Sequence, residues 1–535
     1  MDNIDILIVG AGISGISAAV HLKKMCPQKN VRIIEARASI GGTWDLFRYP
    51  GIRSDSDMHT LGFSFKPWRD AKSIADGPSI LKYVNETVEE HGLFDQIQFN
   101  SRLTKAEWDS ATAQWTIEVD GPAGDLKTAK CKFLMMCGGY YDYEKPHDPG
   151  FKNTDIFKGQ VIHPQFWPGD FEHEGKKIVI IGSGATAMTL APAMADGGAK
   201  VTMVQRSPTY VASRPDKDKV ANFLRKILPA GIAYSITRLK NTKYQEYLYK
   251  QSRKAPKVLK QILLDSVRKH LGVEMTEQHF TPSYNPWDQR LCLIPNGDLF
   301  QAIKRGDLEI RTEEIDSFVE NGLKLSSGEV LPADAIVTAT GLRMKVLCGV
   351  EVTVDKKKID LSESYTYKGM MFSKIPNLIQ TFGYINASWT LRADLTSEYA
   401  CRLINHMESV GADFVIPTLS QEDLLEAPRD WIEDFPSGYM KRAMHLFPKQ
   451  GNGPWQNTQD FSKDKKMCLK SFYQTIPNDE VLNCEADGVV GTIASVVGSI
   501  QANEVIKNIV GIGKSLNGKV LIINLLNLDF RVSNL

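Results

Sequence analysis

The chain has 535 residues, which is long enough for two to four domains. Its 64 Lys and Arg residues balance 63 Asp and Glu residues, so no overall field favours nucleic acid. Eight cysteines without a C-x-x-C pair indicate neither a disulfide scaffold nor a zinc site. No basic leader precedes the first strand pattern and no apolar run is long enough to span a membrane, so we expect a cytoplasmic protein.

The N-terminal sequence predicts a dinucleotide-binding fold. Residues 4–9 read as a buried parallel strand, followed by the turn Gly10-Ala11-Gly12-Ile13-Ser14-Gly15 and a helix through about Cys26. Such a turn brings the backbone close to a pyrophosphate, whose charge the helix N-terminus stabilises. The next strand, residues 31–34, ends in Glu35, a carboxylate that would accept hydrogen bonds from ribose hydroxyls and repel a 2′-phosphate. The ligand is therefore FAD or NAD.

Residues 41–55 read G-G-T-W-D-L-F-R-Y-P-G-I-R-S-D, which we interpret as the wall of a flavin site. Trp44 and Tyr49 can flank a planar ring, and Asp55 ends a tight turn; a glycine-rich surface loop is the alternative. Residues 79–90 predict a helix. Strand patterns at 103–119 and 129–137 predict an antiparallel meander, after which Gly138-Gly139 returns the chain to the flavin.

A second dinucleotide fold follows, with the opposite ribose chemistry. The predicted strand 177–181 leads into Gly182-Ser183-Gly184-Ala185-Thr186-Ala187 and a helix to about Asp196. The next strand, residues 201–205, ends in Arg206, whose guanidinium suits a 2′-phosphate. We therefore assign NADPH to this fold and FAD to the first; the alternative is that Arg206 is a solvated strand-end residue. Together the two folds imply an electron path from NADPH to flavin.

Residues 157–168 read F-K-G-Q-V-I-H-P-Q-F-W-P. Here the chain resembles the Baeyer-Villiger monooxygenases, whose fingerprint is F-x-G-x-x-x-H-x-x-x-W-P and whose second pattern, G-G-x-W-x-x-x-x-Y-P-G-x-x-x-D, matches residues 41–55. His163 is followed by Pro164 and by Trp167-Pro168, which suggest an interdomain linker, so we expect it to orient the chain between the two folds and not to transfer protons. Residues 45–50, 284–292, 295–300 and 386–390 resemble the ethionamide-activating branch, and the resemblance covers about residues 1–470.

The resemblance implies that NADPH and O2 form a flavin peroxide, which inserts one oxygen beside a ketone carbonyl, giving an ester, or adds it to the sulfur of a thioether or thioamide. An anionic peroxide needs a fixed cation near its distal oxygen, and Arg290 is the candidate because arginine stays protonated. Asp55 would orient Arg290 and strengthen its hold on NADP. The alternative is a structural Asp-Arg pair. Arg290 and Asp55 are thus the candidate catalytic residues.

The candidate cofactor-binding residues follow the two turns, the aromatic stretch, the meander and the end of the last predicted strand. They are Gly10, Gly12, Ser14, Gly15, Glu35, Thr43, Trp44, Asp45, Leu46, Arg53, Ser54, Asp55, Leu103, Gly182, Ser183, Gly184, Ala185, Thr186, Ala187, Gln205, Arg206, Ser207 and Gly341. No metal site is expected.

The predicted fold is α/β, with the NADP domain inserted in the FAD domain: 1–150 and 331–470 bind FAD, and 151–330 bind NADP. A basic helical insert spans 215–275, with an apolar stripe at Val258, Ile262, Leu263 and Val267. Residues 217–269 hold fourteen Lys and Arg against three acids. Packing on the NADPH domain with a solvated basic face ranks ahead of peripheral membrane contact.

Residues 471–535 resemble the C-terminal end of adenylyltransferases that activate sulfur-carrier proteins in molybdopterin and thiamine biosynthesis. The ATP-binding fold and cysteine zinc site of those enzymes are missing from the sequence, so we expect a remnant without that activity, and no working thiol at Cys484.

The leading hypothesis is an NADPH-dependent flavin monooxygenase acting on small ketones or sulfur compounds as a monomer or weak oligomer. The alternatives are an N- or S-oxygenating monooxygenase that forms no ester, and an uncoupled NADPH oxidase.

Overall fold

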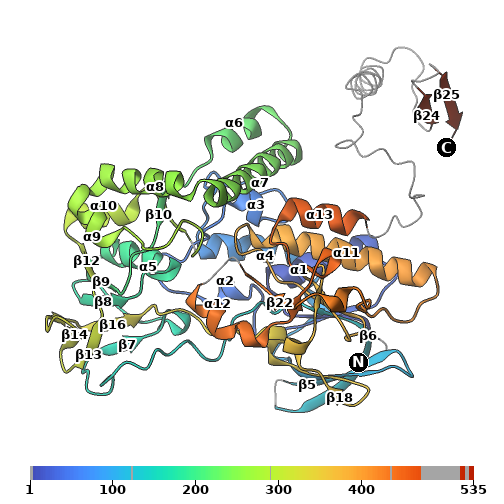
Figure 1. Ribbon diagram of the computed structural model, residues 1–535, viewed down its shortest axis with the longest axis horizontal. Helices are drawn as coiled ribbons and strands as arrows, with labels where there is room; N and C mark the ends of the chain where they lie inside the picture. The colour runs from blue at the N-terminus through green and yellow to red at the C-terminus, as the bar shows by residue number, and fades with distance from the viewer. Residues whose placement is uncertain are drawn as a thin grey trace. The chain divides into compact units, whose positions relative to one another are not determined.

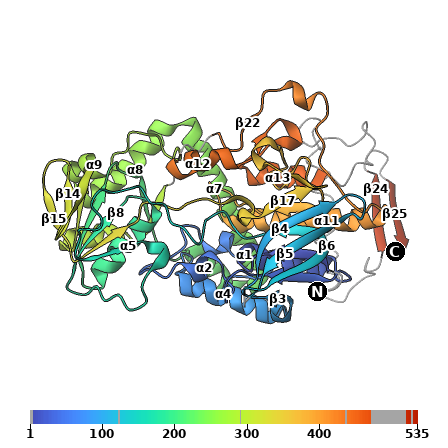
Figure 2. The ribbon, with the colours of Figure 1, turned by 90° about the horizontal axis from the view of Figure 1, so that it is seen from below.

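The computed structural model describes residues 4–121, 124–289, 291–433, 437–470, 519–524 and 529–534. The chain separates into two compact units, Met1–Leu469 and Lys470–Leu535. In the first unit the two principal sheets lie at opposite ends, with the N-terminal sheet at the right in Figure 2 and the second at the left.

The N-terminal sheet has nine strands in the order β18-β17-β4-β5-β6-β1-β2-β3, and β21 pairs with β6. The core of this sheet is parallel, because β1 pairs in parallel with β2 and with β6. The predicted meander is present, and its last strand, β6, also serves as the central parallel strand. The strands are β1 Ile4–Val9, β2 Val31–Ile34, β3 Ile97–Gln98, β4 Arg102–Asp109, β5 Gln114–Asp120, β6 Leu126–Met136, β17 Glu351–Val354, β18 Lys357–Lys358 and β21 Leu378–Gln380.

Helices from distant parts of the chain cover this sheet. Helix α1 (Ile13–Met25) packs against α11 (Trp389–Ser409) and, less extensively, against α4 (Gly77–Glu90). The short helices α2 (Thr43–Leu46) and α3 (Met58–Leu61) lie between α1 and α4 in sequence. Because α11 and the strands β17 and β21 come from beyond residue 350, this half of the molecule is built from two separated parts of the chain, as the sequence predicts.

The second sheet is wholly parallel, in the order β12-β9-β8-β16-β7. Helices α5 (Ala185–Asp196) and α10 (Asp298–Arg305) pack together beside it, and β13–β15 form a small antiparallel sheet. The strands are β7 Gln160–Ile162, β8 Lys177–Ile181, β9 Lys200–Gln205, β12 Leu308–Thr312, β13 Ile315–Val319, β14 Gly322–Leu325, β15 Val330–Pro332 and β16 Ala335–Thr338. Since β16 pairs with β8 and β7, the chain leaves this sheet after Thr338, later than the boundary predicted at residue 331.

The helical insert begins and ends at one place, because β10 (Val211–Arg214) pairs in parallel with β11 (Cys292–Pro295). Between these strands lie α6 (Lys219–Ile227), α7 (Ala230–Lys254), α8 (Pro256–Leu271) and α9 (Val273–His279), green in Figure 1. On α8 the predicted stripe is half wrong: Leu263 and Val267 are buried, whereas Val258 and Ile262 are exposed. Leu263 and Leu264 pack against Tyr210, and this contact selects the buried face.

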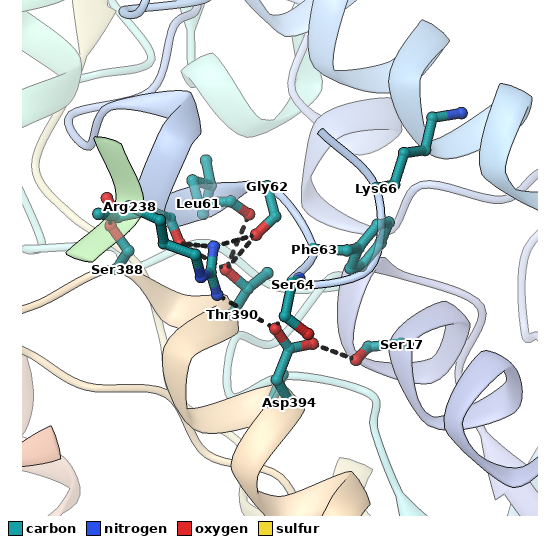
Figure 3. Close-up of polar contacts among 12 residues, drawn as sticks. Ser17, Leu61, Gly62, Phe63, Ser64, Lys66, Arg238, Ser388, Thr390 and Asp394 are labelled. Atoms are coloured by element: carbon teal, nitrogen blue, oxygen red, sulfur yellow. Dashed lines mark hydrogen bonds and ion pairs between the residues drawn. The ribbon is translucent and has the colours of Figure 1, made fainter. Parts of the chain in front are cut away.

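Helix α7 also packs on the N-terminal half of the molecule, a contact the sequence did not predict. The Arg238 guanidinium donates to the carbonyl oxygens of His59 (3.1 Å), Thr60 (3.1 Å) and Gly62 (2.7 Å), and it pairs with Asp394 of α11 at 3.1 Å (Figure 3). Asp394 also accepts hydrogen bonds from the Ser17 hydroxyl (2.8 Å) and the Ser64 amide (2.9 Å). The helical insert is therefore held both by the elements beside the second sheet and by the helices that cover the N-terminal sheet.

The remaining elements of the first unit are short pairs and helices: β19 Thr366–Tyr367 with β20 Met371–Phe372, β22 Arg429–Asp430 with β23 Lys449–Gln450, α12 Gly438–Ala443 and α13 Phe461–Lys470. In the second unit β24 (Lys519–Asn524) and β25 (Asp529–Asn534) pair as antiparallel strands. The prediction on Cys484 lies outside the described residues.

Among the described residues no helix is both long and apolar enough to cross a membrane, and no cluster of metal-ligating side chains occurs.

Candidate functional site

A large cleft connects the two dinucleotide-type folds. It holds about 2060 Å³ of space, including its open mouth, and reaches from the end of β1 to the start of α5. Twelve of the predicted site residues line it: Gly10, Gly12, Ser14, Glu35, Thr43, Trp44, Arg53, Ser54, Asp55, Leu103, Ala185 and Thr186. These twelve residues, which lie up to 176 positions apart in the sequence, are thus brought to one surface.

The first glycine turn fits a close backbone approach. Gly10 has φ +103°, and a Cβ there would lie 3.0 Å from the carbonyl oxygen of Cys137. A Cβ on Gly15 would lie 1.9 Å from the carbonyl oxygen of Gly10, so Gly15 holds α1 against the turn without lining the cleft. The first turn of α1 carries no acidic side chain, which leaves its N–H groups and positive dipole end available to a phosphate.

Glu35 is buried on the cleft wall. One carboxylate oxygen accepts a hydrogen bond from the Ala11 amide (2.7 Å) and the other accepts one from the Arg37 amide (2.9 Å). Burial raises the pKa of Glu35, and these two hydrogen bonds partly offset that effect. Each oxygen keeps a further lone pair, so the residue can still accept a hydroxyl from a ribose.

The aromatic stretch 41–55 joins the two folds. Phe47, Tyr49 and residues 52–56 line the cleft. A Cβ on Gly51 would lie 2.5 Å from the Cβ of Ala193, so the stretch presses on α5. Desolvation by burial raises the pKa of Tyr49, against a hydrogen bond with Thr186. The interpretation of a surface loop is therefore wrong for this stretch.

Two predicted residues in this stretch have structural partners. The carboxylate of Asp45 is buried and pairs with Arg37 at 2.7 Å and with Arg48 at 2.9 Å. Leu46 packs against the core of the second sheet. Neither residue is among those that line the cleft, so their contribution is to hold the wall through these contacts.

Arg53 offers a vacant donor to the cleft. One nitrogen of its guanidinium pairs with Asp298, while Nη2 is buried without a hydrogen-bond partner among the described residues. A buried guanidinium nitrogen is costly to leave unmatched, so an acceptor on a bound ligand is the natural partner. The prediction that Arg53 contacts a cofactor fits this geometry.

The second glycine turn repeats the design of the first. Gly182 has φ +135°, and a Cβ there would lie 2.4 Å from the carbonyl oxygen of Ala339. The Ser183 hydroxyl donates to the carbonyl oxygen of Ser207 at 3.1 Å and accepts from Thr209 at 3.1 Å, which ties the turn to the end of β9. Gly184 caps α5 and is exposed, and Ala187 is buried in the core.

At the end of β9 the two predicted residues differ. Arg206 is exposed, so its guanidinium is available to a phosphate. Gln205 is buried, and its side-chain amide donates to the carbonyl oxygen of His279 and to the Thr312 hydroxyl, both at 2.8 Å. Gln205 therefore fastens α9 to the second sheet.

The predicted catalytic pair is described only in part. Asp55 is exposed on the cleft wall, whereas Arg290 lies outside the described residues. Leu293, on β11, lines the same cleft.

His163 lies where the sequence analysis expects an orienting residue. Its Nδ1 accepts from the Gln165 amide at 3.2 Å, which leaves Nε2 to donate to the carbonyl oxygen of Gly341 at 3.3 Å. Burial lowers the pKa of His163 and favours the neutral ring that this pattern needs. The ring thus joins the segment after β7 to the segment after β16, and Gly341 takes part through its carbonyl group.

Tyr140, Tyr141 and Tyr143 line the cleft and were missed by the sequence analysis, whereas Trp389 lies in the stretch 386–390 that carries part of the family resemblance. Trp389 donates from Nε1 to the Ser14 hydroxyl at 2.7 Å and stacks on Tyr140 at 5.3 Å. Tyr143 shares a hydrogen bond of 3.1 Å with Thr43. Three tyrosines within four positions of the Gly138-Gly139 pair were a usable signal, because residues at the carboxyl end of a central parallel strand face the ligand crevice.

The first glycine turn lines the cleft through Gly10 and Gly12, and the second reaches it through Ala185 and Thr186. Two such turns beside one cleft are the arrangement of a two-dinucleotide oxidoreductase. The model of the family described as flavin-binding monooxygenase-like matches residues 4–411, so the chain belongs to that family.

Relatives support the assignment over most of the chain. The probable FAD-binding monooxygenase AlmA of Acinetobacter baylyi is 49% identical over 87% of this chain and 93% of its own length. The FAD-containing monooxygenase EthA of Mycobacterium tuberculosis is 47% identical over 87% of this chain and 95% of its own.

Solved structures share the fold. An oxidized steroid monooxygenase bound to NADP has a TM-score of 0.72 at 21% identity, covering 88% of this chain and 97% of that one. OTEMO in complex with FAD and NADP has a TM-score of 0.65 at 21% identity, covering 78% and 88%.

The C-terminal resemblance is also confirmed. Residues 441–535 match the ThiF family. The match begins about thirty residues before the predicted boundary at 471, within a segment whose residues 441–469 belong to the first compact unit.

Proposed function

We propose that this protein uses FAD and NADPH to insert one oxygen atom of O2 into ketones, giving esters, and onto the sulfur of thioethers and thioamides. The observation that carries the proposal is the single cleft shared by both glycine turns, because it lets a hydride donor and a flavin meet. The names of EthA and AlmA as FAD monooxygenases support the flavin, and the NADP of the steroid monooxygenase supports the second cofactor.

Residues of the cleft and of the second glycine turn beside it fit both cofactors. The α1 N-terminus and Glu35 would hold the pyrophosphate and ribose of FAD, and the unmatched Nη2 of Arg53 would take an acceptor on a cofactor. The α5 N-terminus and the exposed Arg206 would hold the phosphates of NADPH. FAD reduced by NADPH supplies the activation of O2.

The chain itself would supply charge and shape. We propose that Arg290 holds a permanent positive charge beside the reacting oxygen and that Asp55 orients it. We further propose that Tyr140 and Trp389, which line the cleft and stack at 5.3 Å, form an aromatic wall that keeps water from the reacting oxygen. Excluding water matters because the attraction between the Arg290 guanidinium and an anionic oxygen is strongest where the dielectric constant is low.

Product analysis separates this proposal from its alternatives. Purified enzyme is given a phenyl ketone or a thioether, NADPH and ¹⁸O2, and the ester, sulfoxide and hydrogen peroxide are measured against NADPH consumed. The proposal expects one labelled oxygen in the ester for most of the NADPH oxidised. Sulfoxide without ester would favour an N- or S-oxygenating enzyme, and peroxide equal to NADPH would favour an uncoupled oxidase.

For residues 471–535 we infer a remnant without adenylyltransferase activity. The support is the length of the ThiF match, which covers only residues 441–535 and includes no glycine-rich turn of its own between a strand and a helix pattern. Pyrophosphate exchange with ATP and a sulfur-carrier protein tests this: exchange above background would contradict it.

A further inference from the structure

Helices α6 and α7 expose an unusual amount of apolar surface. Along α6 the exposed residues Val220, Phe223 and Ile227 recur at helical spacing, with Phe223 and Ile227 each 59% exposed. Along α7 the same spacing holds for another three: Ile232, Ile236 and Leu239. The two helices contact each other and lie together at the upper edge of the first unit in Figure 1. We call these six side chains the α6–α7 ridge.

The opposite face of α7 explains why the ridge points outward. Tyr234 and Arg238 are committed to the N-terminal half, since the Tyr234 hydroxyl donates to the carbonyl oxygen of Phe63 at 2.9 Å and Arg238 makes the contacts of Figure 3. Ala233 and Thr237 are buried beside them. This face fixes the rotation of the helix, so the ridge cannot turn inward without breaking the Arg238 contacts.

The ridge exposes a sizeable apolar area. If each of its side chains shows about half of its 150–200 Å², the apolar area is on the order of 500 Å². This area equals that of the largest apolar patch on a typical monomer, about 300–600 Å², which is often functional.

Basic residues surround the ridge. From Lys219 to Gln245 the chain holds six Lys and Arg and no Asp or Glu. The basic loop 66–72 lies beside α6, because Arg225 donates to the carbonyl oxygen of Arg69 and the backbones of Lys72 and Lys217 pair as an isolated antiparallel β-bridge. Its Lys and Arg residues therefore add to this charge. The exposed cations of the rim are Arg69, Lys72, Lys217, Lys219 and Lys226, against one exposed acid in the loop, Asp70.

We propose that the α6–α7 ridge docks on an anionic lipid surface. The apolar side chains enter the boundary between headgroups and acyl chains while the surrounding cations meet the phosphates. A second copy of the chain fits less well, because a two-fold interface would place this basic surface against itself. The ridge belongs to neither glycine turn, so the proposal does not depend on the oxygenation reaction.

Vesicle sedimentation of the full-length protein with its flavin tests the proposal. We expect binding to vesicles of phosphatidylglycerol and phosphatidylcholine, weaker binding to phosphatidylcholine alone, and weaker binding at high salt. The variant Phe223→Ser/Ile236→Ser should lower the partition coefficient at least tenfold. The variant Lys219→Gln/Lys226→Gln should lower it about fivefold per lysine, on anionic vesicles only.

The matched control is Leu424→Ser/Leu425→Ser, which removes side chains that are 60% and 86% exposed among acidic neighbours. It should bind vesicles within twofold of wild type, and all variants should keep the wild-type flavin spectrum and melting temperature. Wild type left in the supernatant, or equal partition of the ridge variant and wild type, overturns the proposal. A dimer that dissociates in the ridge variant, without vesicle binding, assigns the ridge to a second copy and also overturns it.

Discussion

Replacing Arg238 by Met tests how firmly the insert is fastened to the N-terminal half. The substitution keeps the length of the side chain and removes its charge, so Asp394, 8% exposed, loses its guanidinium partner. Breaking a buried ion pair from one side typically costs about 3–5 kcal/mol. Ser17 and Ser64 still donate to Asp394, at 2.8 and 2.9 Å, so we expect the lower end, about 3 kcal/mol.

This cost converts to a small but measurable shift. An unfolding entropy of about 2.1 cal/mol/K per residue gives roughly 1 kcal/mol/K for a unit the size of Met1–Leu469, so the melting temperature should fall by about 3 °C. Calorimetry of wild type, Arg238→Met, Asp394→Asn and the double variant measures it. In the Asp394→Asn background the arginine substitution should cost less than half as much.

A matched surface substitution, Lys226→Met, should move the melting temperature by less than about 0.5 °C. A shift below 1 °C for Arg238→Met, or equal shifts in both backgrounds, would refute the role given to the Arg238–Asp394 pair.

Three further predictions concern the cleft and its linker. Arg206→Ala should raise the KM for NADPH about 10–100-fold and leave kcat/KM for NADH within twofold, because only the 2′-phosphate contact is lost; equal effects on both would contradict it. Glu35→Gln should weaken FAD binding to the apoprotein about tenfold, measured by fluorescence titration, since an amide keeps only one of two acceptors. Burial lowers the pKa of His163, so its contribution to stability is present above about pH 6.5 and is lost as the pH falls. His163→Asn should therefore flatten the rise in melting temperature from about pH 5.5 to 7.

The glycine turns could be predicted because their signal is local. At Gly10 and Gly182 a strand, a turn with positive φ and a helix follow one another within about twenty residues, and each turn must pass close to another backbone. The same reasoning singled out Glu35 and Arg206 as candidates, since each directly follows the next strand. The glycines and aromatic residues of 41–55 suggested the wall of a flavin site, and the family resemblance then supported that interpretation.

Contacts between distant residues could not be predicted in this way. Arg238 and Asp394 are 156 positions apart, and Trp389 meets Ser14 over 375 positions. Nothing in the local pattern of either partner identifies the other. Asp45 shows a different limit: its partners Arg37 and Arg48 are near in sequence, but they could be identified only once the direction of its side chain on α2 was known.

Helical periodicity on its own gave a partly wrong answer for the insert. Val258, Ile262, Leu263 and Val267 share an apolar stripe, yet only Leu263 and Val267 face the protein. Which apolar side of a helix is buried depends on its neighbours, here Tyr210.

The most direct test of the central claim compares Arg290→Ala with wild type in a single turnover. Each enzyme is reduced by NADPH without oxygen, then mixed with O2 and a ketone, and the reduction rate and ester yield are measured. If the Arg290 cation acts only on oxygen insertion, we expect the variant's flavin reduction rate to stay within a few fold of wild type. Its ester yield should fall by at least about a hundredfold. Full ester yield from Arg290→Ala would contradict the account.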